Sequence, residues 1–233
     1  MRIQDTRFVI LDTETTGLDP EMDKVVELSL VEVSTRGIVP LFDAQINPQR
    51  DIPCTASAIH HITAKHVADK PTLEEVWPTV LTHLTGAVLV AHNAPFDRSM
   101  LPETGRPWLC SRRFAKHLWP EAPAYGNQVL RYWLDLDIDA ERAHSAVGDT
   151  LVTAHIWERE LAFYRGHVAQ TDLVEDLIRY VNSPIPVTVM PFGKHKGEAL
   201  SAIPLSYVQW ALTNLSDLDP DLRASLEERM RVG

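Results

Sequence analysis

The stretch that decides the fold is FVILDTETTGLD, residues 8–19, an apolar run that ends in two acidic residues. Successive side chains of a strand point to opposite faces, so Asp12 and Glu14 point the same way. At about 6–7 Å apart, such like charges repel by about 2–3 kcal/mol at an effective dielectric of about 20. A solvated strand end tolerates this repulsion, and a fold that binds a cation there makes use of it.

The composition, 233 residues with 45% hydrophobic and 23% charged, is that of an ordinary soluble globular protein. The length suffices for one large core with a small appendage. Charges interrupt the apolar runs before membrane-spanning length, and the start MRIQDTRFVIL lacks a signal-peptide apolar stretch, so we expect a cytoplasmic protein without membrane segments. Cys54 and Cys110 have no metal-site spacing and suit a reducing compartment, and we expect both to be buried thiols.

The charge distribution limits the classes of partner. A formal net charge of −10 and a pI near 5.4 argue against a protein that coats long duplex nucleic acid, but not against an enzyme that grips a few phosphates at a chain end. Between residues 98 and 133 six basic residues stand against two acids, which makes a local basic island; a solvated helix face is the alternative for any one of them. The basic residues are Arg98, Arg106, Arg112, Arg113, Lys116 and Arg131.

Hydrophobic periodicity predicts an antiparallel meander of three strands over residues 7–15, 24–34 and 40–48. Short helices are expected within 51–71. A helix over 72–86 has Thr72 as N-cap and Glu75 as its capping-box partner, and Pro78 is expected to kink or shorten it. A buried strand and a helix follow at 87–93 and 94–101, then a strand and a helix within 108–120, and helices at 127–136 and 143–166.

The pattern changes after residue 166. One short helix and a Pro-rich connector occupy 167–186, and a small module follows at 187–233, with a short strand, a Gly-flanked basic turn and two helices. We therefore divide the chain into a main domain over 1–166, a linker over 167–186 and a C-terminal module over 187–233. A meander followed by helix–strand–helix units indicates an α+β or mixed α/β layer fold.

Further acids stand where a sheet presents functional groups. Asp97 lies on the first turn of a helix after a buried strand, although an acid that complements the helix dipole is the alternative. His144 and Asp149 open the last long helix of the main domain. Asp149 is flanked by apolar residues, and an inward carboxylate costs several kcal/mol unless it finds a cation or donors.

The order of these residues resembles the DEDDh family of 3′→5′ exonucleases. The three family motifs stand here as LDTETTGL (11–18), AHNAPFDRSML (91–101) and HSAVGDT (144–150). The segments AIHHIT and ADKP resemble the family's connection between the first two motifs. In the family's Tyr variety the tyrosine stands four residues before the last Asp, and here that residue is Ser145, so the His variety is indicated. The tail from residue 192 resembles the exonuclease X branch of the family.

The resemblance implies an α/β fold, a ribonuclease-H-like mixed β-sheet flanked by helices, with a small α+β C-terminal module. It implies two Mg²⁺ or Mn²⁺ ions, which hard carboxylate oxygens select. Asp12, Glu14 and Asp149 would hold the nucleophile-side ion, Asp12 would bridge to the second, and Asp97 would ligate that one mainly through water. His144 would be the general base, since an imidazole pKa near neutrality suits that role.

Substrate contacts are also carried over from the family. The loop after the first two acids would meet the terminal nucleotide, with the backbone near Thr15 at the 3′-hydroxyl and the side chain of Leu18 against the base. Phe96 would pack beneath the last base, with a core-anchoring role as the alternative. Arg112 and Arg113 of the basic island are candidate phosphate contacts.

The turn PFGKHKGEAL, residues 191–200, lacks the spacing of a nucleoside-triphosphate loop. Its Lys194 and Lys196 either touch a nucleic-acid backbone or belong to a plain solvated turn.

The sequence as a whole predicts a metal-dependent 3′→5′ exonuclease that releases nucleoside 5′-monophosphates from DNA single strands and duplex 3′ ends, in repair or related metabolism. The alternatives are an RNA-trimming or oligoribonucleotide-degrading enzyme of the same family, a polymerase proofreading subunit, and a catalytically silent nucleic-acid-binding protein. The oligomeric state stays open, a homodimer included.

Overall fold

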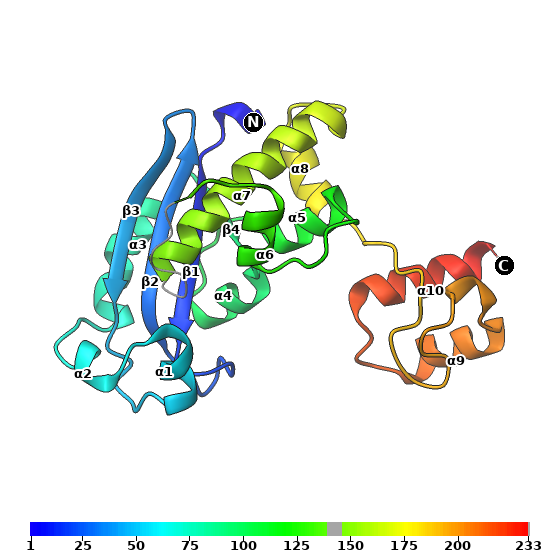
Figure 1. The fold of residues 1–233 in the computed structure, drawn as a ribbon, viewed down its shortest axis with the longest axis horizontal. Helices are drawn as coiled ribbons and strands as arrows, with labels where there is room; N and C mark the ends of the chain where they lie inside the picture. Colours follow the sequence, from blue (N-terminus) through cyan, green and yellow to red (C-terminus); the bar gives the residue numbers. More distant parts are fainter. Residues whose placement is uncertain (139–145, 233) are drawn as a thin grey trace. The chain divides into compact units, whose positions relative to one another are not determined.

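A computed structural model describes residues 1–138 and 146–232 (Figure 1). The chain divides into two compact units, Met1–Val181 and Asn182–Gly233. Across the described residues, none of the helices is both long and apolar enough to cross a membrane.

The first unit is built on a five-stranded mixed sheet in the order β3-β2-β1-β4-β5. β1 pairs antiparallel with β2 and parallel with β4, β2 pairs antiparallel with β3, and β4 pairs parallel with β5. The predicted three-stranded meander is thereby confirmed. The strands are Phe8–Thr15 (β1), Val25–Ser34 (β2), Gly37–Gln45 (β3), Val88–Ala91 (β4) and Trp108–Cys110 (β5).

Helices cover both faces of this sheet (Figure 1). In the first unit they are Ile3–Asp5 (η1, a 3-10 turn), Cys54–His60 (α1), Ala64–Val67 (α2), Leu73–Leu84 (α3), Ala94–Met100 (α4), Ser111–Leu118 (α5), Asn127–Trp133 (α6), Ala146–His167 (α7) and Val174–Val181 (α8). In the second unit they are Leu200–Ala202 (η2, a 3-10 turn), Leu205–Asn214 (α9) and Pro220–Val232 (α10).

The alternation of β1 divides the first unit into two apolar cores. Phe8 and Ile10 pack into the core beneath α7, whereas Val9 and Leu11 pack into the core on the side of α3. All four side chains are buried. Because the face repeats every second residue, the acids that follow at positions 12 and 14 belong to the face that α7 covers.

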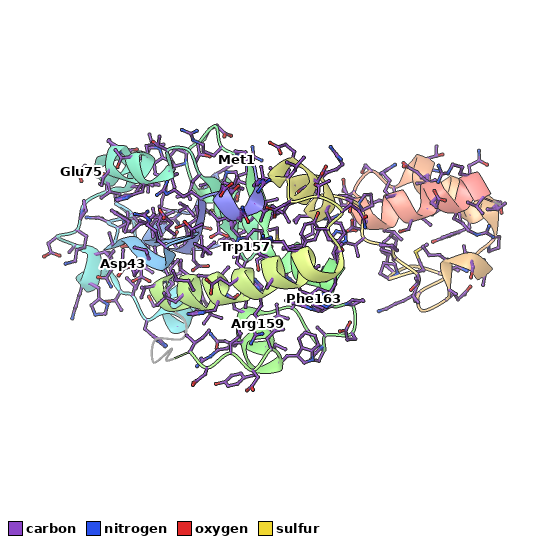
Figure 2. All side chains as sticks on the ribbon, turned by 90° about the horizontal axis from the view of Figure 1, so that it is seen from above. Met1, Asp43, Glu75, Trp157, Arg159 and Phe163 are labelled. Atoms are coloured by element: carbon purple, nitrogen blue, oxygen red, sulfur yellow. The ribbon has the colours of Figure 1, made fainter. Side chains whose placement is uncertain are left out.

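The long helix α7 is the centre of the first core. Trp157 is fully buried and meets the rings of Phe8 and Phe114, each at a centroid distance of 5.3 Å. Figure 2 shows Trp157 within the protein and Arg159, two residues on, at the outside of the helix. This packing fixes α7 across β1 and β2, and it fixes the beginning of the helix near the end of β1.

The helix predicted over 72–86 is α3, and its capping box is confirmed. The Thr72 hydroxyl accepts the Glu75 N–H at 3.3 Å, and the Glu75 carboxylate accepts the Thr72 N–H at 2.7 Å. Gly86, with φ of +71°, follows the end of the helix. Pro78 lies inside α3, which continues to Leu84, so the helix is not broken there.

Two boundaries differ from the sequence prediction. β3 begins at Gly37 rather than at Pro40, because β3 is an edge strand and its pairing register shifts at Pro40, where a missing N–H is tolerated. The short strand expected at the start of the C-terminal module is a single bridge between Val189 and Ala199. One turn with Gly193 and Gly197 follows Val189 closely, and the 3-10 turn η2 begins at Leu200, so the pairing ends after this bridge.

The two cysteines are less buried than predicted. Cys54 is exposed and Cys110 is half-buried. Cys54 opens α1, whose buried residues are Ala56 and His60. A residue two positions before Ala56 lies on the opposite face of the helix, and this places the thiol in solvent.

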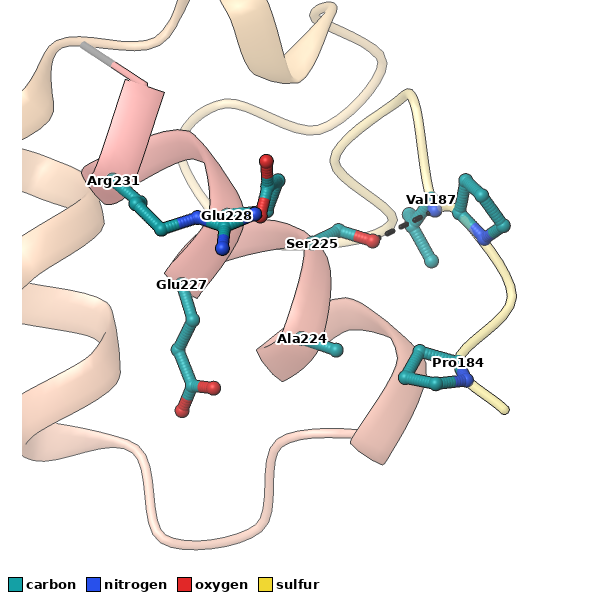
Figure 3. A pocket seen from close by; sticks show the side chains of 8 residues that line it. Pro184, Val187, Ala224, Ser225, Glu227, Glu228 and Arg231 are labelled. Atoms are coloured by element: carbon teal, nitrogen blue, oxygen red, sulfur yellow. Dashed lines mark hydrogen bonds and ion pairs between the residues drawn. The ribbon is translucent and has the colours of Figure 1, made fainter. Parts of the chain in front are cut away.

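In the second unit a small core gathers between α9 and α10, and the chain before it is bound to α10. The Val187 N–H donates to the Ser225 hydroxyl at 2.9 Å (Figure 3), and the Ile185 N–H donates to the Asp221 carboxylate at 2.9 Å. A hollow of about 620 Å³ remains beside these contacts. Asp219 caps α10, because its carboxylate accepts the N–H groups of Asp221 and Leu222 at 2.9 and 3.1 Å.

The cap of α3 gives a prediction on stability. Thr72→Ala removes the acceptor of the Glu75 N–H and should lower the free energy of unfolding by about 1 kcal/mol. Thr72→Ser keeps the hydroxyl and should cost only a few tenths of that amount. Urea denaturation followed by far-ultraviolet circular dichroism measures both, and equal losses for the two variants would show that the hydroxyl does not carry the cap.

Candidate active site

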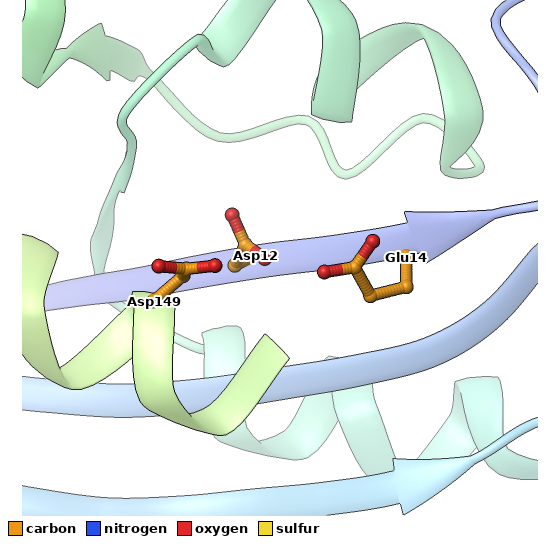
Figure 4. Close-up of side chains that lie close together, drawn as sticks. All are labelled: Asp12, Glu14 and Asp149. Atoms are coloured by element: carbon orange, nitrogen blue, oxygen red, sulfur yellow. The ribbon is translucent and has the colours of Figure 1, made fainter. Parts of the chain in front are cut away.

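Three carboxylates converge where β1 ends beneath the start of α7. Asp12 and Glu14 come from β1 and Asp149 comes from the first turn of α7, and Figure 4 shows the three side chains pointing toward one another. One oxygen from each lies within 4.8 Å of the others. All three residues are half-buried. Residues far apart in the sequence thus form one acidic cluster, as predicted for these positions.

Asp97 lies beside this cluster, on the first turn of α4. Its side chain is 4% exposed, and its Oδ1 accepts the Thr13 N–H at 3.1 Å and the Thr13 hydroxyl at 2.9 Å. Thr13 stands between Asp12 and Glu14, so these bonds tie α4 to the acidic end of β1. Among the charged neighbours of Asp12, Asp97 has the largest effect on its pKa, and this places the fourth acid within electrostatic reach of the cluster.

A fifth acid, Glu27, was not predicted. It is the ladder partner of Glu14 on β2, it is 8% exposed, and it accepts the N–H of Ala146, the first residue of α7, at 2.7 Å. A carboxylate at a helix N-terminus stabilises that end. Glu27 therefore binds the start of α7 to β2, and this holds Asp149 opposite Glu14. The available signal was an acid within the otherwise apolar run VVELSLV.

Burial and mutual repulsion keep protons on these acids. Burial, and then the charges of Asp97, Glu14 and Asp149, raise the pKa of Asp12 well above its usual range. Burial and the charges of Asp149 and Glu27 raise the pKa of Glu14 to about 8. Burial raises the pKa of Asp97 to about 7, against the lowering effect of the bonds from Thr13. Within the described residues, Asp12, Glu14 and Asp97 form no ion pair, so this part of the chain supplies no positive charge that would oppose the upward shift of their pKa values.

The donor set fits a hard divalent cation. Three carboxylate oxygens within 4.8 Å offer the ligands that Mg²⁺ and Mn²⁺ prefer, and the cluster includes no sulfur. Ser29 stands opposite Asp12 in the ladder, and its buried hydroxyl has no hydrogen-bond partner among the described residues. A buried hydroxyl without a partner there is a further oxygen with unused hydrogen-bonding capacity next to the acids.

The loop after β1 is built around Asp23. The Asp23 carboxylate accepts the Thr16 hydroxyl at 2.8 Å and the Asp19 N–H at 3.0 Å. A Cβ on Gly17 would lie 2.3 Å from this carboxylate, so the close approach requires glycine. The ordered loop leaves the Leu18 side chain 82% exposed. An apolar side chain is thus held out in solvent next to the acidic cluster.

The other candidate substrate residues have varied surroundings. The Thr15 hydroxyl donates to the Gly17 carbonyl at 2.6 Å and belongs to the same loop. Phe96 is half-buried and packs against the core on the α3 side, as the core-anchoring alternative requires. Arg112 is exposed, and the Arg113 guanidinium donates to the carbonyl of Val181 at the end of α8 at 3.0 Å.

The structure does not say where two groups of predicted residues lie relative to this cluster. Lys194 and Lys196 are exposed in the second unit. His144 and the neighbouring Ser145 lie outside the residues that the structure describes.

Two family models match the chain. One described as "Exonuclease" matches residues 9–157, and this range contains Asp12, Glu14, Asp97 and Asp149. One described as "Putative quorum-sensing-regulated virulence factor" matches residues 178–214.

Individual proteins give the same result. Over 225 residues the chain is 34% identical to Exodeoxyribonuclease 10 of Escherichia coli (strain K12), with 94% of this chain and 96% of that protein covered. The structure of exonuclease X in complex with 5′ overhanging duplex DNA is 34% identical with a TM-score of 0.61, over 73% of this chain and 99% of that one. The E. coli ExoI–ssDNA complex in its zinc-bound form has a TM-score of 0.57 at 16% identity, over 70% of this chain and 43% of that one, and shows a shared fold.

The mixed sheet, its flanking helices and these similarities confirm the predicted ribonuclease-H-like fold. The chain therefore belongs to the exonuclease family, in its DEDDh branch and close to exonuclease X.

Proposed function

We propose that this nuclease is a metal-dependent 3′→5′ exodeoxyribonuclease that hydrolyses the terminal phosphodiester bond of a DNA 3′ end and releases a nucleoside 5′-monophosphate. The observation that carries the proposal is the cluster of Asp12, Glu14 and Asp149, with their oxygens within 4.8 Å. The same chain is 34% identical to Exodeoxyribonuclease 10 along almost its whole length.

The acids are assigned as cation ligands. Asp12, Glu14 and Asp149 would hold one Mg²⁺ or Mn²⁺ ion, and Asp12 with Asp97 would hold a second. Two such ions supply charge neutralisation at the reacting phosphate and a nucleophilic water at neutral pH. The side chains orient the phosphate by fixing these charges, and Thr13 keeps the Asp97 carboxylate in one orientation through its two bonds.

His144 is assigned as the general base, on the ground that it stands five residues before Asp149 in the sequence. An imidazole nitrogen that is neutral near pH 7 accepts a proton from the attacking water. The proton leaves the site when the imidazolium exchanges with solvent, and the 3′-oxygen of the remaining strand departs with a proton from water.

The loop around Asp23 is assigned to the terminal nucleotide. Thr15 and the backbone after it would meet the 3′-hydroxyl, and Leu18, held outward on an ordered loop, would pack against the terminal base. Exposed apolar contact with a base face suits single strands, and a wedge at the last base pair suits duplex ends. The relative solved with 5′ overhanging duplex DNA supports duplex ends among the substrates.

The first prediction from the proposed function concerns the acidic cluster. Asp12→Asn should lower the rate of monophosphate release by about three orders of magnitude, because a bound cation supplies several kcal/mol of transition-state stabilisation. The assay uses matched DNA and RNA oligomers with Mg²⁺ or with chelator. A 3′ label should be released at once as a mononucleotide, whereas a 5′-labelled strand should shorten step by step.

The matched control is Asp69→Asn, a change of an acid that is 83% exposed in its side chain and is not one of the cluster's three acids. It should digest at the wild-type rate. Normal cleavage by Asp12→Asn would overturn the cation assignment. Faster digestion of RNA than of DNA would move the enzyme to the RNA-trimming alternative.

The second prediction concerns Leu18. Leu18→Ala removes an exposed side chain and should leave folding intact. It should slow digestion of blunt duplex several-fold more than digestion of a single strand of the same sequence, because only the duplex end has a base pair to separate. Equal slowing of both substrates would exclude a wedge role. Leu18 would then be a contact to the terminal nucleobase of single strands and duplexes alike.

The third prediction concerns pH and stability. The folded-state pKa of Glu14, about 8, lies above its ordinary value of 4.5, so the folded protein holds more protons than the unfolded chain between these values. This contribution to stability is complete below about pH 4.5 and is lost as the pH rises toward 8. In chelator, the Tm should therefore fall between about pH 6.5 and 8, and Mg²⁺ should reduce the fall because cations replace the protons.

The comparison with Mg²⁺ separates the cluster from other titrating groups. Burial lowers the pKa of His92 to about 4, and its contribution to the pH dependence, which ends about one unit above the ordinary value of 6.5, should be the same with and without Mg²⁺. Burial also raises the pKa of Glu160, but this carboxylate lies against Ser111 and gives the same slope with and without Mg²⁺. Differential scanning fluorimetry measures the four conditions. An identical pH dependence in chelator and in Mg²⁺ would contradict the cation site.

A further inference from the structure

The second unit carries an ordered basic turn. Gly193 and Gly197 have φ values of +70° and +86°, which let the chain reverse between Met190 and Glu198. The Met190 N–H donates a hydrogen bond to the Glu198 carbonyl at 2.9 Å, and the Gly197 N–H donates to the Met190 carbonyl at 2.9 Å. The turn is thus fixed by its own hydrogen bonds. Lys194 and Lys196, both exposed, project from it.

Aromatic side chains of α9 lie against this turn. The rings of Tyr207 and Trp210, one helical turn apart, are 5.4 Å apart at a tilt of 36°. The His195 ring meets Tyr207 edge-on at 4.4 Å, and a Cβ on Gly193 would lie 3.2 Å from the Tyr207 hydroxyl. The turn and the outer side of α9 therefore form one continuous surface.

Two large aromatic side chains are exposed in this part of the second unit. Trp210 is 49% exposed, and Phe192, the residue before Gly193, is 39% exposed. Tyr207 is half-buried. Neighbouring exposed aromatic rings forgo burial free energy, and grouped exposure of this kind is typical of a binding surface rather than of scattered surface residues.

The part of the second unit that carries the rings has more basic than acidic side chains. Between residues 182 and 216 the charged residues are Lys194, Lys196 and Glu198, and the other acids of the unit all lie at 217–228. Glu198 is paired with His195, its Oε2 lying 2.9 Å from the ring Nδ1. The two lysines thus flank His195, whose ring meets Tyr207, and the acid in this stretch of chain, Glu198, is paired with that histidine.

We propose that Phe192, Lys194, Lys196, Tyr207 and Trp210 form a binding surface for single-stranded DNA, here called the turn–helix patch. Aromatic faces stack on unpaired bases, and lysines beside them contact the phosphates between those bases. Paired bases cannot present their faces in this way, so the surface prefers single strands to duplex. The patch lies inside residues 178–214, outside the segment that the exonuclease model matches, and its binding is separate from hydrolysis.

The test is equilibrium binding of the full chain, in chelator, to a dye-labelled oligothymidylate too short to fold, followed by fluorescence anisotropy. Chelator stops hydrolysis and removes the cations that anchor a strand at the acidic cluster. Trp210→Ala should weaken binding about five- to a hundredfold, the range that the loss of one stacked base covers. Trp210→Phe, which keeps a ring, should restore most of the affinity.

The lysines have a separate signature. Lys194→Ala/Lys196→Ala should flatten the slope of log affinity against log salt by about 1.4, because each of the two lost phosphate contacts removes about 0.7 for a single strand. The matched control is Lys65→Ala/Lys70→Ala, two exposed lysines of the first unit, which should leave the slope unchanged.

Wild-type affinity and slope in both patch variants would overturn the proposal. Equal weakening of duplex and single-strand binding by Trp210→Ala would also overturn it, since stacking on a paired base is not available. Hydrolysis is measured separately with Mg²⁺. A wild-type chain that binds oligothymidylate through the patch but does not hydrolyse it would refute the proposed function and leave the patch intact.

Discussion

The site depends on one constraint, which is that β1 alternates its side chains without interruption from the core into the acids. Phe8 and Ile10 bind the strand beneath α7, and the same face then presents Asp12 and Glu14. A shift of one residue in the pairing of β1 would exchange its two faces, so that the carboxylates of Asp12 and Glu14 would point toward the core on the side of α3. The apolar half of the strand therefore determines the position of the charged half, and the energy of packing offsets the repulsion among the acids.

Two buried acids on β2, Glu32 and Glu27, have opposite electrostatic surroundings. Glu32 is bound by the guanidinium groups of Arg7 and Arg36, which, together with the Ser34 hydroxyl, lower its pKa to about 2 against the effect of burial. Glu27, five residues earlier, stands opposite Glu14, and its charge raises the pKa of that residue. One end of the strand thus carries an acid neutralised by two arginines, whereas the acid at the other end adds negative charge beside Glu14.

Sequence reasoning located the strands, the capping box of α3 and the acids of the cluster, because each leaves a local pattern of alternation, spacing or residue type. It missed Glu27, whose contact with Ala146 joins residues 119 positions apart and has no local signature. It also placed Cys54 in the interior, since a single thiol carries no information on which face of a helix it occupies. It gave the C-terminal module a strand, since a short apolar run does not show whether a second strand is available to pair with it. The patch around Trp210 required the fold, because the turn and α9 meet only in three dimensions.

Gly17 has a consequence for how this enzyme can vary. Any larger side chain there displaces the Asp23 carboxylate, and with it the support of the loop that carries Leu18. The acids on β1 and α7 have their own supports in Thr13 and Glu27, which such a change does not touch. Under the proposed function, the choice of DNA end and the hydrolytic step thus rest on separate sets of contacts, and random drift or directed evolution can alter the first while the second is preserved.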